Sequence, residues 1–304
     1  MKRIWLLTAC LAVLMLANGQ IKTERVPFVE RDSVLSMDIY TPTETLDTLR
    51  PCVVFVFGGG FIRGAKDEKE NVAYCRALAE RGYVSVAIDY RLGMKGVTKV
   101  GVFNYHPLEN AIQMAVEDLY AATNYLLEHS DKLGIDTKRI IISGSSAGAI
   151  TVLQADYELA NQMEAAKVLP TDFHYAGVVS FAGAIFSHEG KPDYKRNPAP
   201  TLMFHGMNDE LVPYKKIQLG QLGFFGSNEI AKQMEKYEFP FYIYRYRDMG
   251  HEIASIPMEK NIEDIDRFIK DYVINQYPLR KDITVKDERI KAGKNWKPED
   301  LYKN

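Results

Sequence analysis

A serine placed between glycines follows a short apolar run and has the sequence context of a nucleophile. The pattern G-x-S-x-G spans residues 144–148 and comes directly after the run 139–143, with Ser146 at its centre. In a sharp turn from strand to helix, such a serine needs glycines beside it because side chains there would collide with neighbouring backbone. A small-residue turn with a purely structural role would have the same pattern. A nucleophilic role for Ser146 therefore requires a base and an acid elsewhere in the chain.

A serine is a poor nucleophile until a base removes its proton and a third group orients that base. Asp209 lies in a polar turn after the apolar run 201–204, and His251 follows the aromatic run 241–246. Like Ser146, each follows an expected strand, and open α/β sheets place their ligands beyond the carboxyl ends of strands. The three residues are therefore predicted to form a catalytic triad.

Other titratable residues near these positions are expected to have structural roles. Glu210 and Asp248 are alternative acids, but Asp248 precedes the base by only three residues and is expected to shape its loop. His205 is expected to satisfy a turn carbonyl near Asp209. The remaining histidines lack a glycine turn after a strand and are expected at the surface or in loops: His106, His129, His174 and His188.

Three successive glycines upstream could stabilise a tetrahedral oxyanion. Gly58, Gly59 and Gly60 follow the apolar run 52–57. Glycines let backbone N–H groups turn toward a ligand without side-chain obstruction. Gly59 and Gly60 are the predicted donors, completed by the N–H of Ala147, the residue after the nucleophile. An isolated triple glycine would be a flexible turn, but nucleophile, acid, base and glycine loop together point to acyl transfer.

These ordered pieces resemble the α/β-hydrolase superfamily, and within it the esterases related to hormone-sensitive lipase and to carbohydrate acyl esterases. The order serine, aspartate, histidine is that of this superfamily. The resemblance spans roughly residues 24–275 and rests on Gly58–Gly60, Asp89-Tyr90-Arg91-Leu92, Gly144–Gly148, Asp209 with Val212-Pro213, and Gly250-His251. It implies a serine carboxylic-ester hydrolase that works through an acyl-enzyme and needs no cofactor.

Three positions depart from the pattern of that esterase group. Phe57 replaces the histidine usual before the glycines, Ser145 replaces a common acidic residue before the nucleophile, and the Ala-Pro-Glu that often follows Tyr-Arg-Leu is missing. None of these changes removes a triad or oxyanion group, so they concern the subfamily and the substrate. Asp89 is expected to pair with Arg91 and hold the fold.

Length and patterning predict a single catalytic domain, because 304 residues with 46% hydrophobic content can bury one large core. Alternating apolar runs and amphipathic segments predict an α/β-hydrolase fold with a mostly parallel central sheet, helices on both faces and an antiparallel N-terminal edge hairpin. The hairpin is expected at 25–30 and 34–40, further strands at 83–89 and 175–181, and helices at 71–81, 106–128, 228–236 and 258–275. The domain is assigned to residues 20–277, followed by a charged C-terminal extension, 278–304, that is packed or solvated.

Residues 1–19 have the features of a secretory signal peptide: a positive start, an apolar stretch and small residues before Gln20. The stretch is shorter than the ~20 apolar residues that span a membrane. Export to the periplasm or the medium is expected, with lipidation at Cys10 as the alternative. Cys52 and Cys75 then remain, expected as buried free thiols, although a disulfide is the other option.

Charge and residue clusters exclude several classes of function. The net charge is −2 with no long basic block, which argues against a nucleic-acid partner. No Cys/His cluster has zinc-site spacing, so no metal is expected. The expected substrate is a small or glycan-linked ester, in a pocket with walls from Phe61 and the segments 93–105, 186–189 and 220–225, without a large lid domain. The alternatives are a serine peptidase of the prolyl-oligopeptidase type and a non-catalytic secreted binding protein.

Overall fold

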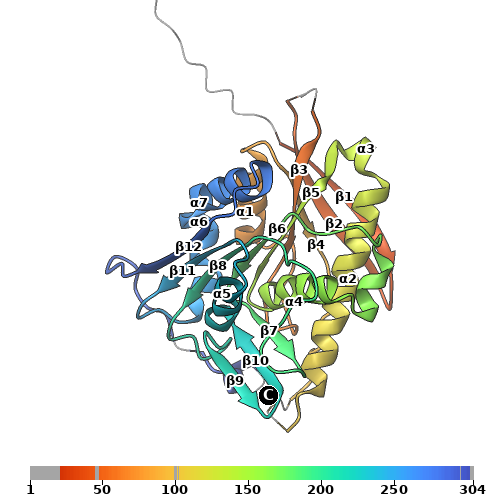
Figure 1. The fold of residues 1–304 in the computed structure, drawn as a ribbon. Helices are drawn as coiled ribbons and strands as arrows, with labels where there is room; N and C mark the ends of the chain where they lie inside the picture. Colours follow the sequence, from red (N-terminus) through yellow and green to blue (C-terminus); the bar gives the residue numbers. More distant parts are fainter. Residues whose placement is uncertain (1–20, 45–47, 99–100, 102, 295, 302–304) are drawn as a thin grey trace, which may run out of the picture.

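Buried apolar runs form the centre of a nine-stranded sheet in the computed structural model, which describes residues 21–301 except 45–47, 99–100, 102 and 295. Its strands are β1 (Ile21–Glu30), β2 (Val34–Pro42), β3 (Arg50–Val56), β4 (Val84–Ile88), β5 (Ile135–Ser145), β6 (Gly177–Phe181), β8 (Thr201–Gly206), β11 (Phe241–Tyr246) and β12 (Arg280–Val285). Their order across the sheet is β1-β2-β4-β3-β5-β6-β8-β11-β12 (Figure 1).

The sheet has the mixed direction that the sequence predicts. β1 pairs with β2 and β2 with β4 in antiparallel fashion, while every later neighbour pair is parallel. The carboxyl ends of the parallel strands consequently share one edge, where ligands of open α/β sheets bind. The predicted fold class is confirmed.

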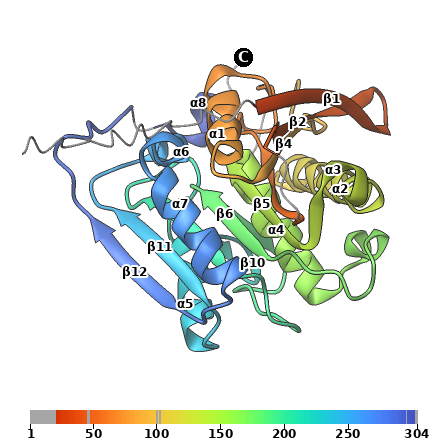
Figure 2. The same cartoon turned by 90° about the horizontal axis from the view of Figure 1, so that it is seen from above.

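Helices cover both faces of this sheet (Figure 2). They are α1 (Lys69–Ala79), α2 (His106–Glu128), α3 (Ser130–Leu133), α4 (Ala147–Asn161), α5 (Ser227–Lys236), α6 (Ile256–Lys260), α7 (Ile262–Phe268) and α8 (Pro298–Leu301), with 3-10 turns η1 (Glu164–Val168) and η2 (His251–Ala254) and a π-helix, η3 (Ile269–Ile274). α1 packs with α6 and α7, and α2 packs with α4.

The helix expected at 258–275 is divided into α6, α7 and η3. The first break lies at Asn261, whose side-chain amide donates to Asp264 at 2.9 Å and whose carbonyl oxygen accepts from the Tyr246 hydroxyl at 2.8 Å. Because asparagine side chains bond local backbone and polar groups, they favour helix ends over helix interiors.

A small second sheet lies beyond the carboxyl edge of the first (Figure 1). It consists of β7 (Ala184–Ser187), β10 (Leu222–Gly226) and β9 (Lys216–Leu219), paired antiparallel in that order. Residues 186–189 and 220–225 are expected from the sequence as pocket walls, but no strands are predicted there. All four residues of β9 are exposed, so the strand has no apolar alternation to reveal it.

The sheet continues past residue 277, where the sequence analysis ended the catalytic domain. β12 pairs in parallel with β11 from Phe241↔Arg280 to Tyr246↔Val285 and forms the sheet edge. The first part of the charged extension is therefore packed against the domain.

Cys52 and Cys75 are buried free thiols, as predicted, and burial raises the pKa of Cys75 to about 12. The expected signal peptide and Cys10 lie outside the described residues. Within residues 21–301, as far as they are described, no helix has the length and apolar character to cross a membrane.

Candidate active site

Ser146 lies in a strained turn between β5 and α4. Its φ is 51° and its ψ −114°, in the positive-φ region that non-glycine residues rarely adopt. A Cβ atom on Gly144 would lie 2.2 Å from the carbonyl oxygen of Gly148, and one on Gly148 would lie 2.0 Å from that of Val56. Both glycines are therefore required sterically, as the sequence analysis predicted.

The three residues predicted as a triad meet at the carboxyl edge of the sheet. Ser146 Oγ is 2.7 Å from Nε2 of His251, and Nδ1 of His251 is 2.8 Å from Oδ2 of Asp209. Since Asp209 can only accept when ionised, this network assigns the proton of neutral His251 to Nδ1 and leaves Nε2 to accept from the serine. Such an arrangement can deprotonate the Ser146 hydroxyl.

Asp209 is held as a carboxylate. Its side chain is 0% exposed, which favours the protonated form, but hydrogen bonds from His205 and His251 keep its pKa well below the usual range. Oδ1 also accepts from the backbone N–H groups of Leu211 and Val212, at 2.9 and 3.0 Å. The alternative acids do not contact the base: Glu210 pairs with Lys297 at 3.2 Å, and the turn residue Asp248 is exposed.

His205 contributes more than its sequence context indicated. Its Nε2 lies 3.2 Å from the Val212 carbonyl, the predicted structural contact, and also 3.4 Å from Oδ2 of Asp209. Its Nδ1 lies 2.8 Å from Oγ of Ser227, which fixes the ring from the other side. His205 is therefore a second, fully buried histidine on the same carboxylate as His251.

Backbone hydrogen bonds join the turn before Asp209, which we call the acid turn, to the segment that leads to His251, which we call the histidine turn. The N–H of Asn208 donates to the Met249 carbonyl at 2.9 Å, and the N–H of Met207 donates to Tyr246 at 2.9 Å. A Cβ atom on Gly206 would lie 2.2 Å from the Gly250 carbonyl oxygen. The glycine after His205 thus permits the close approach that brings the acid and the base together.

The glycine loop lies against the nucleophile. A Cβ atom on Gly58 would be 3.2 Å from Cβ of Ser146, and Gly60 lines the same cavity as Ser146 and Ala147. Gly59 has a φ of 122°, and a Cβ there would be 2.0 Å from the Arg63 carbonyl oxygen. Ala147 is the first residue of α4, and the first N–H groups of a helix have no acceptor within it. The loop and the helix start therefore flank the serine as predicted. Arg63 itself is exposed.

Two departures from the esterase pattern have physical roles here. The Ser145 hydroxyl donates to the carbonyl of Ala254 at 2.8 Å, which ties the serine turn to η2 and its histidine. The Phe57 ring packs on Tyr90 with centroids 4.5 Å apart, and the Tyr90 hydroxyl donates to the Phe57 carbonyl at 3.0 Å. Both residues stabilise the site without entering the triad.

The expected pair between Asp89 and Arg91 is wrong. Asp89 binds the buried Lys66 at 2.7 Å and the hydroxyl of Ser36 at 2.9 Å, on the β2 side of β4. Arg91 instead donates to the buried Asp118 of α2 at 2.9 Å. The chain turns after β4, so the two side chains face opposite neighbours. Lys66 has no motif around it that could have indicated this role.

A cavity of about 310 Å³ opens beside Ser146, and its lining is mostly apolar. Each expected wall contributes, through Phe61, Tyr105, Phe186 and Phe224; residues 99, 100 and 102 of the expected wall 93–105 lie outside the described residues. Other parts of the lining were not predicted, among them Ile217 and Leu219 of β9 and Pro298, Glu299 and Leu301 of α8.

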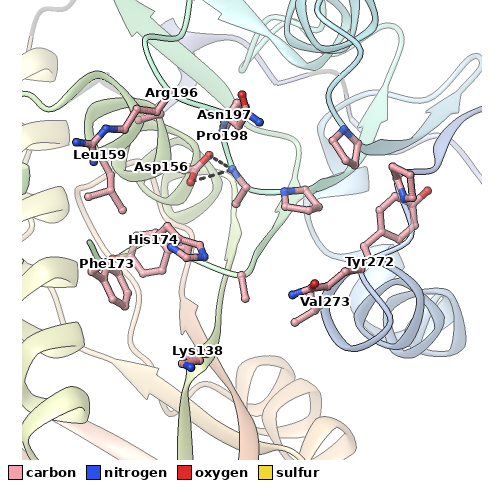
Figure 3. A pocket seen from close by; sticks show the side chains of 18 of the residues that line it. Lys138, Asp156, Leu159, Phe173, His174, Arg196, Asn197, Pro198, Tyr272 and Val273 are labelled. Atoms are coloured by element: carbon pink, nitrogen blue, oxygen red, sulfur yellow. Dashed lines mark hydrogen bonds between the residues drawn. The ribbon is translucent and has the colours of Figure 1, made fainter. Parts of the chain in front are cut away.

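A second cavity of about 490 Å³ lies at the opposite, amino-terminal end of β6, β8 and β11 (Figure 3). In it, both oxygens of the Asp156 carboxylate face the backbone N–H of Ala199, at 3.3 and 3.1 Å. Burial raises the pKa of Asp156 to about 7. No triad residue lines this larger cavity, so the candidate active site is the smaller one. In the described part of the chain, no three His, Cys, Asp or Glu side chains are placed to hold a metal ion.

Parts of the chain are similar to a known protein family and to known esterases. A family model described as BD-FAE matches residues 37–186, a stretch that includes the glycine loop and Ser146. Esterase LipI of Mycobacterium tuberculosis is 34% identical over 111 residues, which are 36% of this chain and 30% of that protein. Carboxylesterase 1C of Rattus norvegicus is 29% identical over 139 residues, 45% of this chain and 23% of that protein. The matches thus span less than a third of these relatives.

Solved structures match over a larger part of the chain. A thermophilic esterase of Thermogutta terrifontis, solved with propionate bound, has a TM-score of 0.59 at 21% identity and covers 84% of this chain and 94% of that chain. The same esterase phosphorylated by paraoxon has a TM-score of 0.57 at 19% identity. At 19–21% identity, the structural similarity to this esterase shows that the two proteins share a fold.

Proposed function

We propose that the chain, which has the α/β-hydrolase fold, is a serine carboxylic-ester hydrolase of that superfamily. The observation that carries the proposal is the continuous chain of contacts from Ser146 through His251 to the buried carboxylate of Asp209. A non-catalytic protein with this fold would not need these contacts between serine, histidine and aspartate. The esterases and carboxylesterases among the matched relatives support the same activity.

The proposed reaction has two halves. Ser146 Oγ attacks the ester carbonyl carbon while His251 Nε2 takes its proton, and Asp209 stabilises the resulting imidazolium. The backbone N–H groups of Gly59, Gly60 and Ala147 receive the oxyanion. His251 then protonates the leaving alcohol, and the C–O bond breaks to give the acyl-enzyme. A water molecule then gives a proton to His251 and attacks the acyl carbon. The bond from this carbon to Ser146 Oγ breaks, His251 returns the proton to Oγ, and the carboxylic acid leaves.

The proposed substrates are short-chain acyl esters, on small alcohols or on carbohydrates. The cavity volume of about 310 Å³ is at the lower end of the ~300–1,000 Å³ typical of ligand pockets. Its apolar lining suits a small hydrocarbon group rather than a charged one. An esterase with the same architecture has been solved with propionate and with butyrate bound.

The proposal includes export from the cytoplasm, which rests on the composition of residues 1–19 alone. Mass spectrometry of the protein recovered from its natural compartment tests this. A mature chain that begins near residue 20 is expected. A lipid attached at Cys10 would identify the exported protein as lipid-anchored instead, and an intact N-terminus would contradict export.

The activity is tested by hydrolysis of p-nitrophenyl acetate and by labelling with a fluorophosphonate. We expect wild type to turn over and to be labelled, and Ser146→Ala to lose both. Ser145→Ala is a matched control one residue away: it loses the bond to Ala254 but should keep the label. Failure of folded wild type to hydrolyse the ester or to take the label would reject the proposal, and turnover of aminoacyl-proline amides in preference to esters would favour the peptidase alternative.

A further inference from the structure

The end of the described chain forms one wall of the cavity that contains Ser146. We call residues 286–301, which follow β12, the C-terminal strap; residue 295 within it is not described. Pro298, Glu299 and Leu301 of the strap line the cavity. A Cβ atom on Gly60 would lie 3.0 Å from Cδ1 of Leu301, so this methyl group rests directly over the glycine loop.

The strap lies beside the turns that carry Asp209 and His251, and an ion pair joins it to the first of them. Lys297 Nζ is 3.2 Å from Oε2 of Glu210, the residue after Asp209. A Cβ atom on Gly293 would lie 3.2 Å from Oε2 of Glu252, the residue after His251. The strap therefore follows the acid and histidine turns before it reaches the cavity.

This attachment is local and weak. The Lys297 and Glu210 side chains are 58% and 48% exposed, and ion pairs with this exposure contribute little to stability. Asp300 Oδ2 accepts from the N–H of Lys297 at 3.1 Å, which closes the turn into α8 within the strap itself. A substitution in α8 can consequently change the cavity without disturbing the central sheet.

Apolar side chains make up most of the remaining wall. Phe186 and Phe224 pair with ring centroids 6.0 Å apart, and both line the cavity. Ile217 and Leu219 add apolar surface from β9. A group bound between the second sheet and Leu301 would therefore be hydrocarbon, with its length limited by the strap.

We propose that Leu301 is a specificity-determining residue, and that the C-terminal strap restricts the ester cavity to short apolar groups. This inference rests on the proposed esterase function, because selectivity between esters is its consequence. Leu301 lies against Gly60 and is not a member of the triad, so its substitution should change which ester is preferred and should leave the nucleophile intact.

The test uses the full chain with Leu301→Ala and Leu301→Trp. kcat/KM is measured on p-nitrophenyl acetate, butyrate and octanoate, and separately on acetates of methyl, butyl and hexyl alcohol. In one of the two series, Leu301→Ala should raise the ratio of the longest to the shortest ester by about tenfold, the effect of one or two methylene-sized contacts. Leu301→Trp should lower that ratio. The series that responds identifies whether the acyl or the alcohol group lies against the strap.

A distant control and a second strap variant separate a change in ester preference from a general loss of structure. Leu49→Ala removes a leucine that is 52% exposed just before β3, at the other end of the sheet, and should leave both ratios unchanged. Lys297→Glu should loosen the strap and move the ratio in the direction of Leu301→Ala, while the exchange Lys297→Glu with Glu210→Lys should restore it.

The failure of this inference is distinct from that of the proposed function. If the Leu301 and Lys297 variants keep wild-type ratios in both series while acetate turnover and fluorophosphonate labelling persist, the strap proposal is wrong and the esterase proposal stands. Absence of turnover and labelling in wild type would overturn both.

Discussion

At the scale of single residues, the most unusual feature is that one buried carboxylate serves two histidines. Oδ2 of Asp209 is 2.8 Å from Nδ1 of His251 and 3.4 Å from Nε2 of His205. A buried charge is costly unless it is paired and hydrogen-bonded, and here two rings and two backbone N–H groups supply the partners. We infer that His205 positions Asp209, which in turn orients His251.

His205→Leu tests this positioning. It removes a hydrogen bond to a charged group, worth roughly 1.5–3 kcal/mol, so kcat should fall about tenfold or more. With one donor fewer, the Asp209 carboxylate should also bind protonated His251 more strongly, which moves the acid limb of the kcat/KM profile to higher pH. His205→Gln, whose amide can replace the Nε2 donor, should recover most of both. A loss of stability with an unmoved pH profile would mean that His205 is only structural.

Asp209→Asn tests the acid itself. An amide cannot stabilise the imidazolium and can hold the ring in the wrong tautomer, so kcat should fall about 10⁴-fold with little change in KM. Glu210→Gln is the matched control, since Glu210 binds Lys297 and does not contact His251. Turnover of Asp209→Asn near the wild-type rate would remove Asp209 from the triad.

Residues with a glycine or strand context were predictable from sequence, and those with distant partners were not. The positions of Ser146, Asp209 and His251 follow from local patterns, because each turn needs small residues after a strand. The partner of Asp89 is instead Lys66, whose contact depends on how the glycine loop folds back toward β2. The same holds for the bond from Ser145 to Ala254, residues that are far apart in the chain.

At the scale of elements, the turn between β5 and α4 is the most constrained part of the fold. Gly148, the second residue of α4, lies so close to β3 that a Cβ atom there would be 2.0 Å from the Val56 carbonyl oxygen. The same strand leads into the glycine loop. One glycine therefore sets the distance between the nucleophile and the proposed oxyanion donors.

Gly148→Ala should force β3 and α4 apart. We expect a loss of about 2–3 kcal/mol in the free energy of unfolding, as for overpacked cores, and a large fall in kcat. Gly134→Ala, at the other end of β5, is the control: its φ is 66° but no atom lies within 4 Å of the new Cβ. It should cost about 1–2 kcal/mol for backbone strain and retain turnover. Urea unfolding and ester hydrolysis measure both, and equal effects of the two substitutions would contradict this account.

Burial decided which elements could be predicted. β4 and β6 are buried along their whole length and were evident as apolar runs. β9 is exposed throughout and β12 nearly so, and both are held by a neighbouring strand rather than by a buried face of their own. These two strands support the cavity wall and the strap. Their position depends on pairing with β10 and β11, which the local sequence pattern does not predict.

At the scale of the whole molecule, the two edges of the central sheet have different chemistry. The carboxyl edge carries the triad, the glycine loop and the apolar cavity. The amino-terminal edge carries the larger cavity with Asp156 at one side (Figure 3). α4 extends between them, since Ala147 at its start flanks the nucleophile and Asp156 lies in its third turn. The charge of Asp156 is therefore expected to affect the stability of the fold rather than the reaction at Ser146.

Asp156 should make the stability of the protein depend on pH. Its pKa is raised from 3.8 to about 7 by burial, so the folded state retains a proton that the unfolded state has lost. Stability is then lost as pH rises from about 4 to about 7, by at most roughly 4 kcal/mol, and stays at the lower value above that range. Asp156→Asn cannot ionise, so its advantage over wild type in urea unfolding should grow across this window. The exposed Asp131→Asn is the control and should show a constant difference. A constant difference for Asp156→Asn as well would mean that its carboxylate is ionised in the folded protein at neutral pH and is stabilised by more than the Ala199 N–H.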